Sequence, residues 1–545
     1  MMATLTLALA VSACSRRGGC RDEYCGTLVF AAVGSVTTLL PPLSGASLER
    51  DVFDQILLRL ADFRAGASTI GDSGFVPQLA RSWEWTDPLT ITFHLDPRAR
   101  WHDGPPVTAA DVQFTFESYT DTALGAGESK ALSRIASVTA ADSLTAVFRF
   151  REAYPEAFFD AAFHMRILPA HLLRDVPRNA WQTAAFGRAP IGNGPYRLVR
   201  WVPNEIMELA ADSMFFLGRP HLRRLIFRFA SDLNVGVTQV VAGDADAIEV
   251  LVAPPNIERA QAADHLALYP YAGTTYTFMR FNLRANGDAL RPHPLFGDPD
   301  VRRALVLATD RERMVQSATA GRAKVPPGPM PQQWSWLWVP ELTPPPFDTA
   351  AAGRLLTARG WRDSNGDGIR DRAGRRLSFH VAVPTTSALR KQYARLLQEQ
   401  FRAVGVELVI DEMDNAALSD RQNAGSFDAT LESFQTDPSP IASVPGIWGT
   451  GGASNFGHYA NAAVDRSMRA AARASSQAEA RTAWVTAFQI MAQDAPAILL
   501  YALDNVAAVN TRVTGVEIRP DSWLALVRNW RIPPDRLNER DRVGR

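Results

Sequence analysis

The chain has 545 residues, and its 57 basic and 57 acidic side chains give a formal net charge of zero. Because nucleic-acid binding depends on a basic surface that neutralises phosphates, this balance argues against a nucleic-acid partner. With 46% hydrophobic residues the chain can bury a substantial core, and its length favours more than one domain.

A short apolar run opens the chain at residues 3–13 and ends in the sequence VSAC, residues 11–14. The run is too short to cross a bilayer, which requires ~20 apolar residues, and no later segment is apolar enough to do so. It is typical of a signal peptide, residues 1–13, whose small residues before Cys14 resemble a bacterial lipobox, so that Cys14 would carry a lipid. No Lys or Arg precedes the run, which a mis-assigned start codon would explain. A buried strand with a chance cysteine is the alternative.

The three cysteines, Cys14, Cys20 and Cys25, all lie in the first 25 residues. With Cys14 lipidated, residues 14–26 form a tether in which Cys20 and Cys25 remain as a pair. An exported chain can oxidise such a pair, so we expect a disulfide. A zinc site is the alternative, but two thiols lack further ligands, because the first histidine is His94.

A strand, a turn and a helix are predicted in succession before residue 117. Residues 89–95 (LTITFHL) alternate between apolar and polar, which is the period of a half-buried strand. Residues 103–106 (DGPP) form a turn, since Gly tolerates positive φ and Pro fixes φ. Thr108 then begins a helix as its N-cap, with Asp111 as the capping-box acid. We interpret Trp101, His102 and Asp103 as scaffold, because no nucleophile or metal ligand stands beside them.

Further along, strands alternate with helices. Residues 408–410 (LVI) and 498–501 (ILLY) are predicted strands, and residues 387–403 and 478–493 have the pattern of helices. This alternation indicates an α/β fold.

Two segments that flank the predicted strand, 77–85 (PQLARSWEW) and 101–116 (WHDGPPVTAADVQFTF), carry a recognisable pattern. Together they resemble the hallmark of the family 5 extracytoplasmic solute-binding proteins, the peptide-binding subunits of ABC importers. The resemblance spans roughly residues 27 to 532. It continues in order through 167–173 (ILPAHLL), 190–196 (PIGNGPY), 298–305 (DPDVRRAL), 309–312 (TDRE), 360–361 (GW), 367–370 (DGIR), 404–408 (VGVEL), 455–459 (NFGHY) and 494–496 (DAP).

The resemblance implies an α/β fold of the periplasmic-binding-protein-like class, type II, cluster C. Such a fold has two main lobes, an extra subdomain and an interlobe ligand cleft, and its chain leaves the first lobe and returns to it twice. Mapped by motif, lobe I holds residues 27–72, 187–278 and 496–545, the second lobe (the extra subdomain) holds 73–186, and lobe III holds 279–495.

Enzyme signatures are absent from the sequence. The segment 71–74 (GDSG) resembles the nucleophile motif of trypsin-like proteases, but those need a histidine before the serine and the first here is His94. None of the three lysines precedes Ser or Thr, which excludes a phosphate-binding P-loop, and no His-Glu-x-x-His occurs. We therefore expect no enzymatic activity, no cofactor and no catalytic metal.

Residues 363–371 (DSNGDGIRD) partly match a calcium-binding loop, with oxygen ligands at positions 1, 3, 5 and 9 and glycine at position 6. Position 12 is Gly374, where such loops carry a bidentate glutamate. An Asp/Asn/Gly-rich hairpin turn before a strand at residues 377–381 is the favoured interpretation.

The candidate site is the segment 427–437 (FDATLESFQTD), because a cleft between lobes can enclose a ligand and exclude water. In peptide-binding relatives the corresponding strand pairs with the peptide backbone, an aromatic residue lies against it, and an aspartate meets the α-ammonium group. The resemblance puts the aspartate at Asp437 and the aromatic, usually Trp, at Phe434. Ser433 and Gln435 belong to the same expected contact set. The alternative for Asp437 is a turn residue before Pro438.

Other residues are expected near the cleft by the same resemblance. Thr37, in 35–38 (SVTT), would lie on a strand beside the ligand, and Tyr276 and Asn282 on a crossover between lobes. For each of them a scaffold role is favoured over ligand contact. Trp334, Trp336 and Trp338 lie in a Pro-rich loop. They suit ligand stacking or packing between lobes, of which packing is favoured.

The resemblance implies a receptor that binds a peptide or peptide-like solute and delivers it to the permease and ATPase subunits of an ABC importer. It would be periplasmic or cell-surface, held to a bacterial membrane only by its lipid anchor. Relatives bind nickel chelates, sugars, haem and antibiotics on the same scaffold, so a non-peptide solute is the first alternative. A receptor that has lost transport coupling and acts in sensing is the second.

Overall fold

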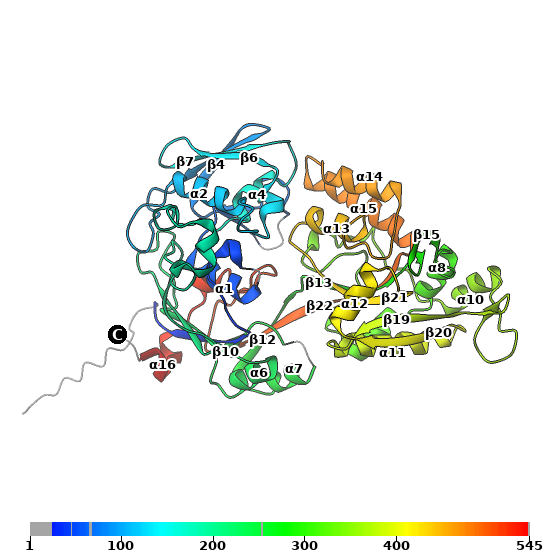
Figure 1. Cartoon of the computed structure of the whole chain (residues 1–545). Coiled ribbons are helices and arrows are strands. Elements are labelled where there is room, and N and C mark those ends of the chain that lie inside the picture. The colour runs from blue at the N-terminus through cyan, green and yellow to red at the C-terminus, as the bar shows by residue number, and fades with distance from the viewer. Residues whose placement is uncertain (1–23, 45, 65–67, 252–253, 543–545) are drawn as a thin grey trace, which may run out of the picture.

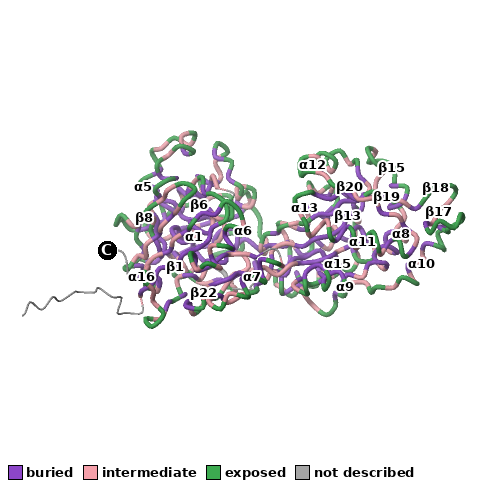
Figure 2. The backbone as a smooth tube through the Cα atoms, turned by 90° about the horizontal axis from the view of Figure 1, so that it is seen from below, coloured by how far each residue is buried: buried purple, intermediate pink, exposed green. Residues whose placement is uncertain are grey.

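The computed structural model describes residues 24–44, 46–64, 68–251 and 254–542. Within these residues the chain forms two bodies joined by a narrow waist (Figure 1, Figure 2). A mixed sheet runs through both bodies. Its strand order is β20 (Glu407–Met413), β19 (Ser378–Pro384), β21 (Ala429–Gln435), β13 (Thr275–Phe281), β22 (Ala497–Asn510), β11 (Ala247–Ile248), β1 (Thr27–Val33), β10 (Arg224–Ala230), β9 (Ile206–Ala211) and β8 (Tyr196–Val202), with β12 (Leu266–Ala272) and β16 (Ala323–Lys324) paired to β22.

The waist consists of strands that pair with both bodies. The first half of β22 pairs with β13 and β16, and its second half pairs with β11 and β12. The chain therefore crosses between the bodies at Gly273, between β12 and β13, and again near Leu503 inside β22. A Cβ atom on Gly273 would lie 2.2 Å from the carbonyl oxygen of Leu503, so the two crossings pack together only because residue 273 is glycine. The motif-based ranges 187–278 and 496–545 differ from these crossing points by several residues and stay a prediction.

The first body combines lobe I with the second lobe around a shared core. Side chains of β1, such as Leu28 and Phe30, belong to the same buried cluster as Phe93, Phe148 and Phe158 of the second lobe. The second lobe has a sheet in the order β4 (Ala80–Asp87), β5 (Thr90–Leu95), β7 (Thr145–Phe150) and β6 (Ile135–Ala140). The separate pair β2 (Ala61–Phe63)–β3 (Phe75–Pro77) spans the predicted boundary between lobe I and the second lobe. The helices of this body are α1 (Ser47–Ile56), α2 (Ala109–Tyr119), α3 (Ser129–Leu132), α4 (Ala157–Phe163), α5 (Ala170–Leu173), α6 (Leu233–Val241), α7 (Pro254–Gln261) and α16 (Glu539–Arg542).

The predicted strand, turn and capped helix are confirmed as β5 and α2. The carboxylate of Asp111 accepts a hydrogen bond from the backbone N–H of Thr108 at 2.8 Å, as in a capping box. Trp101 is buried, and the His102 backbone N–H donates to the carbonyl oxygen of Gly192 at 2.7 Å. These contacts give the motif a scaffold role, because they join the second lobe to lobe I.

The glycines of segment 190–196 are required by close backbone contact. A Cβ atom on Gly192 would lie 2.0 Å from the carbonyl oxygen of Ile56, and one on Gly194 would lie 2.6 Å from that of Gln55. The backbone N–H of Asn193 donates to the same Ile56 oxygen at 3.0 Å. The turn thus packs directly against the C-terminal end of α1.

We refer to the second body as lobe III, and in it helices cover both faces of the sheet (Figure 1). Alternate side chains of β13 enter different cores: Met279 and Phe281 one cluster, Tyr276 and Phe278 the other. The predicted helices 387–403 and 478–493 are confirmed as α11 and α15, and the predicted strands as parts of β20 and β22. The helices are α8 (Pro299–Leu307), α9 (Arg311–Thr319), α10 (Thr349–Ala358), α11 (Ala388–Arg402), α12 (Asn415–Asn423), α13 (Pro440–Trp448), α14 (Ala462–Ala471) and α15 (Gln477–Asp494), and the hairpins are β14 (Arg284–Ala285)–β15 (Asp288–Pro292) and β17 (Asp371–Arg372)–β18 (Arg375–Arg376).

Segment 363–371 is a turn held by its own side chains. The carboxylate of Asp363 accepts backbone N–H groups of Gly366 and Gly368 at 2.8 and 3.0 Å, and the segment leads into the β17–β18 hairpin. In the described part of the chain no group of three or more His, Cys, Asp or Glu could hold a metal ion. The hairpin interpretation of this segment fits these contacts.

The N-terminal predictions fall largely outside the described residues. Residues 1–23, and with them Cys14 and Cys20, are not described. Cys25 is disulfide-bonded, and its pairing with Cys20 stays a prediction. Among the described helices, none combines the length and the apolar character needed to cross a membrane.

Candidate functional site

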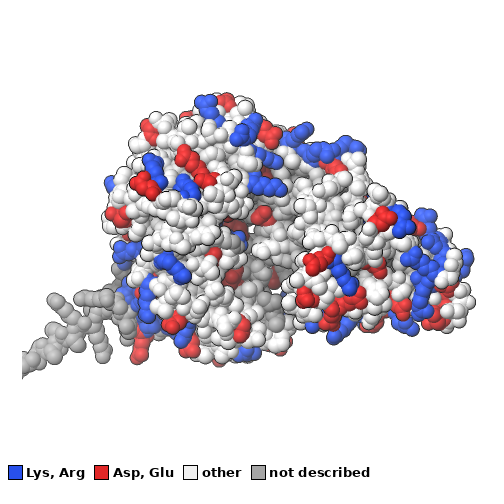
Figure 3. Space-filling model, viewed as in Figure 1, with Lys and Arg blue, Asp and Glu red and all other residues white. Residues whose placement is uncertain are grey.

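A cavity of about 1220 Å³ lies between the two bodies. Figure 3 shows this hollow, with Asp and Glu side chains along it. Its walls come from α1, the α3–α4 region and residues 520–523 on one side, and from residues 435–452 and α14 on the other, with Tyr271, Thr274, Thr275 and Asn505 from the crossing strands between them. A ligand that fills this cavity would contact both bodies.

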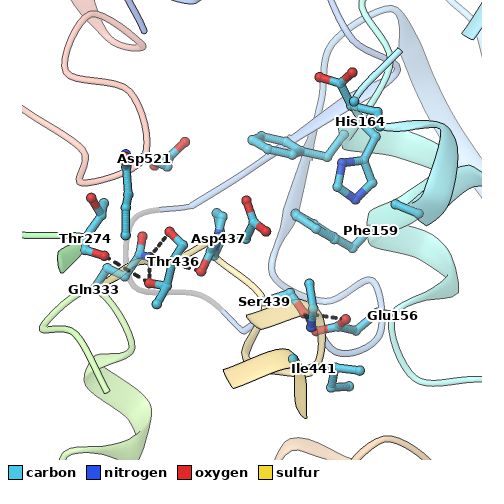
Figure 4. Close-up of a pocket in the computed structure, with 18 of the residues that line it drawn as sticks. Glu156, Phe159, His164, Thr274, Gln333, Thr436, Asp437, Ser439, Ile441 and Asp521 are labelled. Atoms are coloured by element: carbon cyan, nitrogen blue, oxygen red, sulfur yellow. Dashed lines mark hydrogen bonds between the residues drawn. The ribbon is translucent and has the colours of Figure 1, made fainter. Parts of the chain in front are cut away.

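Asp437 presents a fixed carboxylate on the lobe III wall, just after β21. Its backbone oxygen accepts hydrogen bonds from Gln333 Nε2 at 3.0 Å and Trp334 Nε1 at 2.9 Å, and its N–H donates to Ser443 Oγ at 3.1 Å. The carboxylate itself has no hydrogen-bond or ion-pair partner among the described residues. Figure 4 shows Asp437 between Gln333 and Thr436 on one side and Phe159 on the other. The backbone is rigidly held while the charge remains available to a ligand.

The other predicted residues of β21 differ in whether they line the cavity. Gln435 lines the cavity with Asp437. Phe434 packs half-buried against a lobe III core, and Ser433 Oγ bonds to Thr277 Oγ1 at 2.7 Å; neither residue lines the cavity. The structure therefore brings together Asp437 and Gln435 of this predicted set.

The remaining predicted contacts are held in structural roles. Tyr276 is buried, and its hydroxyl accepts a hydrogen bond from Trp448 Nε1 at 2.9 Å. Asn282 is buried and donates to the carbonyl oxygen of Phe427 at 3.0 Å, and Thr37 Oγ1 donates to Glu49 at 2.7 Å. None of the three lines the cavity.

The tryptophans of the Pro-rich loop pack inside lobe III. Trp334 and Trp336 are buried in the same cluster as Tyr276, and Trp338 packs against that cluster. The packing is inside lobe III and not between the lobes as the sequence suggested. Trp334 has an added function, since its indole N–H donates to the backbone oxygen of Asp437.

A buried carboxyl group, Glu156, joins the second lobe to lobe III across the cavity wall. Ser439, the N-cap of α13, donates its hydroxyl to Glu156 at 2.5–2.7 Å (Figure 4). Thr69 donates to the same carboxyl group. Burial raises the pKa of Glu156 to about 7, and the hydrogen bonds from Ser439 and Thr69 offset only part of this rise.

The raised pKa of Glu156 predicts that the stability of the protein depends on pH. The folded protein holds the proton above the ordinary pKa of 4.5, so the stabilisation is complete below pH 4.5 and is lost as pH rises through about 7. Glu156→Gln stays neutral at every pH. We expect the stability of wild type, relative to this variant, to fall by about 3 kcal/mol between pH 4.5 and pH 8, measured by urea unfolding. Equal pH profiles for the two proteins would contradict the prediction.

The lobe I wall carries further carboxyl groups, whose pKa values are shifted in opposite directions. Burial opposes ionisation of Asp54, but the ion pairs with Arg166 at 2.7 Å and Arg59 at 3.2 Å lower its pKa to about 2. Asp51 and Glu249 lack such pairs: burial raises the pKa of Glu249 to about 6, and burial together with the charge of Glu249 raises the pKa of Asp51 well above its usual range.

These wall residues were not found from the sequence. Glu156, Asp51 and Glu249 come from distant parts of the chain and belong to none of the recognised motifs. Only the folded arrangement brings them to one cavity, so no local pattern could have identified them.

Comparisons with known proteins show which family the chain resembles over most of its length. The family model described as bacterial extracellular solute-binding proteins, family 5 middle, matches residues 74–456. The oligopeptide-binding protein AppA of Bacillus subtilis is 25% identical over 552 aligned positions, covering 96% of this chain and 97% of that protein. Protein XP55 of Streptomyces lividans is 28% identical and covers 86% of this chain and 83% of that one. The probable D,D-dipeptide-binding periplasmic protein DdpA of Escherichia coli is 23% identical and covers 83% of this chain and 84% of that one.

Solved structures agree on the fold. AppA of Bacillus subtilis in complex with a nonapeptide has a TM-score of 0.71 at 24% identity, covering 93% of this chain and 99% of that one. NikZ of Campylobacter jejuni in complex with Ni(L-His) has a TM-score of 0.73 at 24% identity, with the same coverage. Likeness at this identity shows the fold alone, and it confirms the predicted α/β binding-protein architecture. The chain belongs to the bacterial extracellular solute-binding proteins of family 5.

Proposed function

We propose that the protein captures peptides or peptide-like solutes in the interlobe cavity and delivers them to the permease of an ABC importer. The observation that carries the proposal is the Asp437 carboxylate, which is fixed by its backbone and has no partner among the described residues. A single fixed carboxylate suits the α-ammonium group that every unmodified peptide carries, because ammonium-to-carboxylate hydrogen bonds are charge-assisted.

The size of the cavity supports a peptide. Its volume of about 1220 Å³ exceeds the ~300–1,000 Å³ of typical small-molecule sites. The relative AppA of Bacillus subtilis is named an oligopeptide-binding protein, and its structure holds a nonapeptide. A ligand of several residues is therefore the best fit.

The waist supports capture by closure. The bodies are joined by crossings at Gly273 and near Leu503, and a ligand that contacts both walls favours the closed arrangement by its differential affinity for the two states. Membership in the family supports the proposed delivery to a permease.

Native mass spectrometry of the protein purified from its own cells tests the proposal. A retained ligand with the mass and fragmentation of a peptide is the expected result. Retention of a non-peptide solute, such as a metal chelate, together with no calorimetric binding of peptides to the emptied protein, would overturn it.

Membrane attachment through Cys14 is a further part of the proposal, motivated by residues 11–14 (VSAC). Cys14→Ser removes the thiol that would be lipidated, and the protein should move from the membrane fraction to the aqueous extract. The wild-type protein, fractionated in parallel, should stay with the membranes. A variant that still sediments with membranes in detergent-free buffer would refute attachment through Cys14.

A further inference from the structure

Two carboxylates on the lobe I wall of the cavity lack a bonded cation. Asp51, in α1, is only 6% exposed and lines the cavity; its Oδ2 accepts from Trp523 Nε1 at 3.1 Å, while its Oδ1 has no donor among the described residues. The carboxylate of Glu249, which follows β11, has no hydrogen-bond or ion-pair partner within the described chain.

Two other acidic residues of the same wall are paired with arginines, unlike Asp51 and Glu249. Asp54 is bonded to Arg59 and Arg166, and Asp521 to Arg519 at 2.6 Å. Arg50 is near enough for its charge to act on Asp51 and Glu249, but its guanidinium group donates to Ser47 Oγ at 3.1 Å and bonds to neither carboxylate.

Two buried carboxylates without a neighbouring bonded cation are an unfavourable arrangement. Burial raises the pKa of both carboxyl groups, and the charge of Glu249 raises that of Asp51 further, so ionisation of both groups is opposed where they stand. A ligand cation between them would relieve the repulsion and supply the missing donors. An ammonium group has three N–H donors and a guanidinium group five, so either can bond to two carboxylates at once.

We infer that Asp51 and Glu249 form a subsite for a lysine or arginine side chain of the bound peptide, and that the receptor prefers basic peptides. The inference rests on the proposed peptide function and deepens it. Asp437 on the lobe III wall binds the α-ammonium group, and the lobe I pair binds the second cation. One ligand then bonds to both bodies through its two positive charges, which couples the preference for basic peptides to closure of the cleft.

Calorimetry with matched peptides tests the subsite. The probes are alanine pentapeptides with one lysine at the second, third, fourth or fifth position, and the same series with norleucine, which keeps the aliphatic chain and lacks the ammonium group. At one position or more, lysine should bind about tenfold or more tightly than norleucine, which corresponds to about 1.4 kcal/mol. In the double variant Asp51→Asn, Glu249→Gln this preference should fall below about threefold.

A control variant separates this subsite from general electrostatic attraction. Asp465→Asn removes another carboxylate charge from the cavity wall, on lobe III, and should keep the lysine preference of wild type. Equal binding of lysine and norleucine peptides at every position, or a preference that survives in the double variant, would overturn the inference while the peptide function stands. If neither series binds to wild type, the proposed function itself fails.

Discussion

Asp437→Ala should weaken peptide binding by on the order of a hundredfold or more. Inside the closed cavity the carboxylate and the α-ammonium group are both removed from water, and loss of one partner leaves the other charge buried alone. Breaking such a pair typically costs ~3–5 kcal/mol, and each 1.4 kcal/mol is a tenfold change in affinity. Because the backbone of residue 437 is held by Gln333, Trp334 and Ser443, the substitution should leave the wall in place. Isothermal titration calorimetry measures the loss.

A change on the ligand shows whether this loss reports the α-ammonium contact. N-acetylation of the peptide should weaken binding to wild type by a similar factor, and it should add little further loss in Asp437→Ala, because both changes break one interaction. Additive losses, or equal binding of acetylated and free peptides to wild type, would mean that Asp437 acts only as a turn residue before Pro438.

Local signals in the sequence were sufficient for much of the fold. The alternation in residues 89–95 and the Thr108–Asp111 capping box each depend on neighbours in the chain, and both are present in the structure as β5 and α2. The motif glycine Gly192 is explained by a backbone contact with Ile56 that no larger residue permits. Family resemblance supplied the order of the lobes, which no local pattern contains.

The site was predicted less completely, because side-chain direction on a strand changes with every residue. Thr275 lines the cavity while the adjacent Tyr276 faces a lobe III core, and Gln435 lines it while Phe434 does not. Both faces of the lobe III sheet are covered, so hydrophobicity along β13 does not reveal which positions face the ligand. The acidic lobe I wall depends on tertiary contacts, and the sequence holds no local signal for it.

A buried ion network anchored by Arg512 joins three distant segments of lobe I. Its guanidinium group bonds to Asp246 at 2.8 and 3.0 Å, to Asp541 at 2.7 Å, and to the carbonyl oxygen of Thr27 at 2.7 Å. Both aspartates are fully buried. The network thus fixes the start of β1, the start of β11 and the C-terminal helix α16 to the end of β22.

Arg512→Met should lower the stability of lobe I by ~3–5 kcal/mol, because it keeps most of the side-chain volume but leaves two buried carboxylates without their main cation. Arg540→Met is the matched control. Arg540 lies 3.4 Å from the Asp246 carboxylate and is partly exposed, and Asp246 keeps Arg512, so this loss should stay below about 1 kcal/mol. Unfolding of a two-body protein need not be two-state, so the lobe I transition should be followed by hydrogen exchange of the β1 and β10 amides. Similar small losses in both variants would mean that the buried network contributes no more than an exposed ion pair, and that packing of β1 and α16 holds the C-terminal segment.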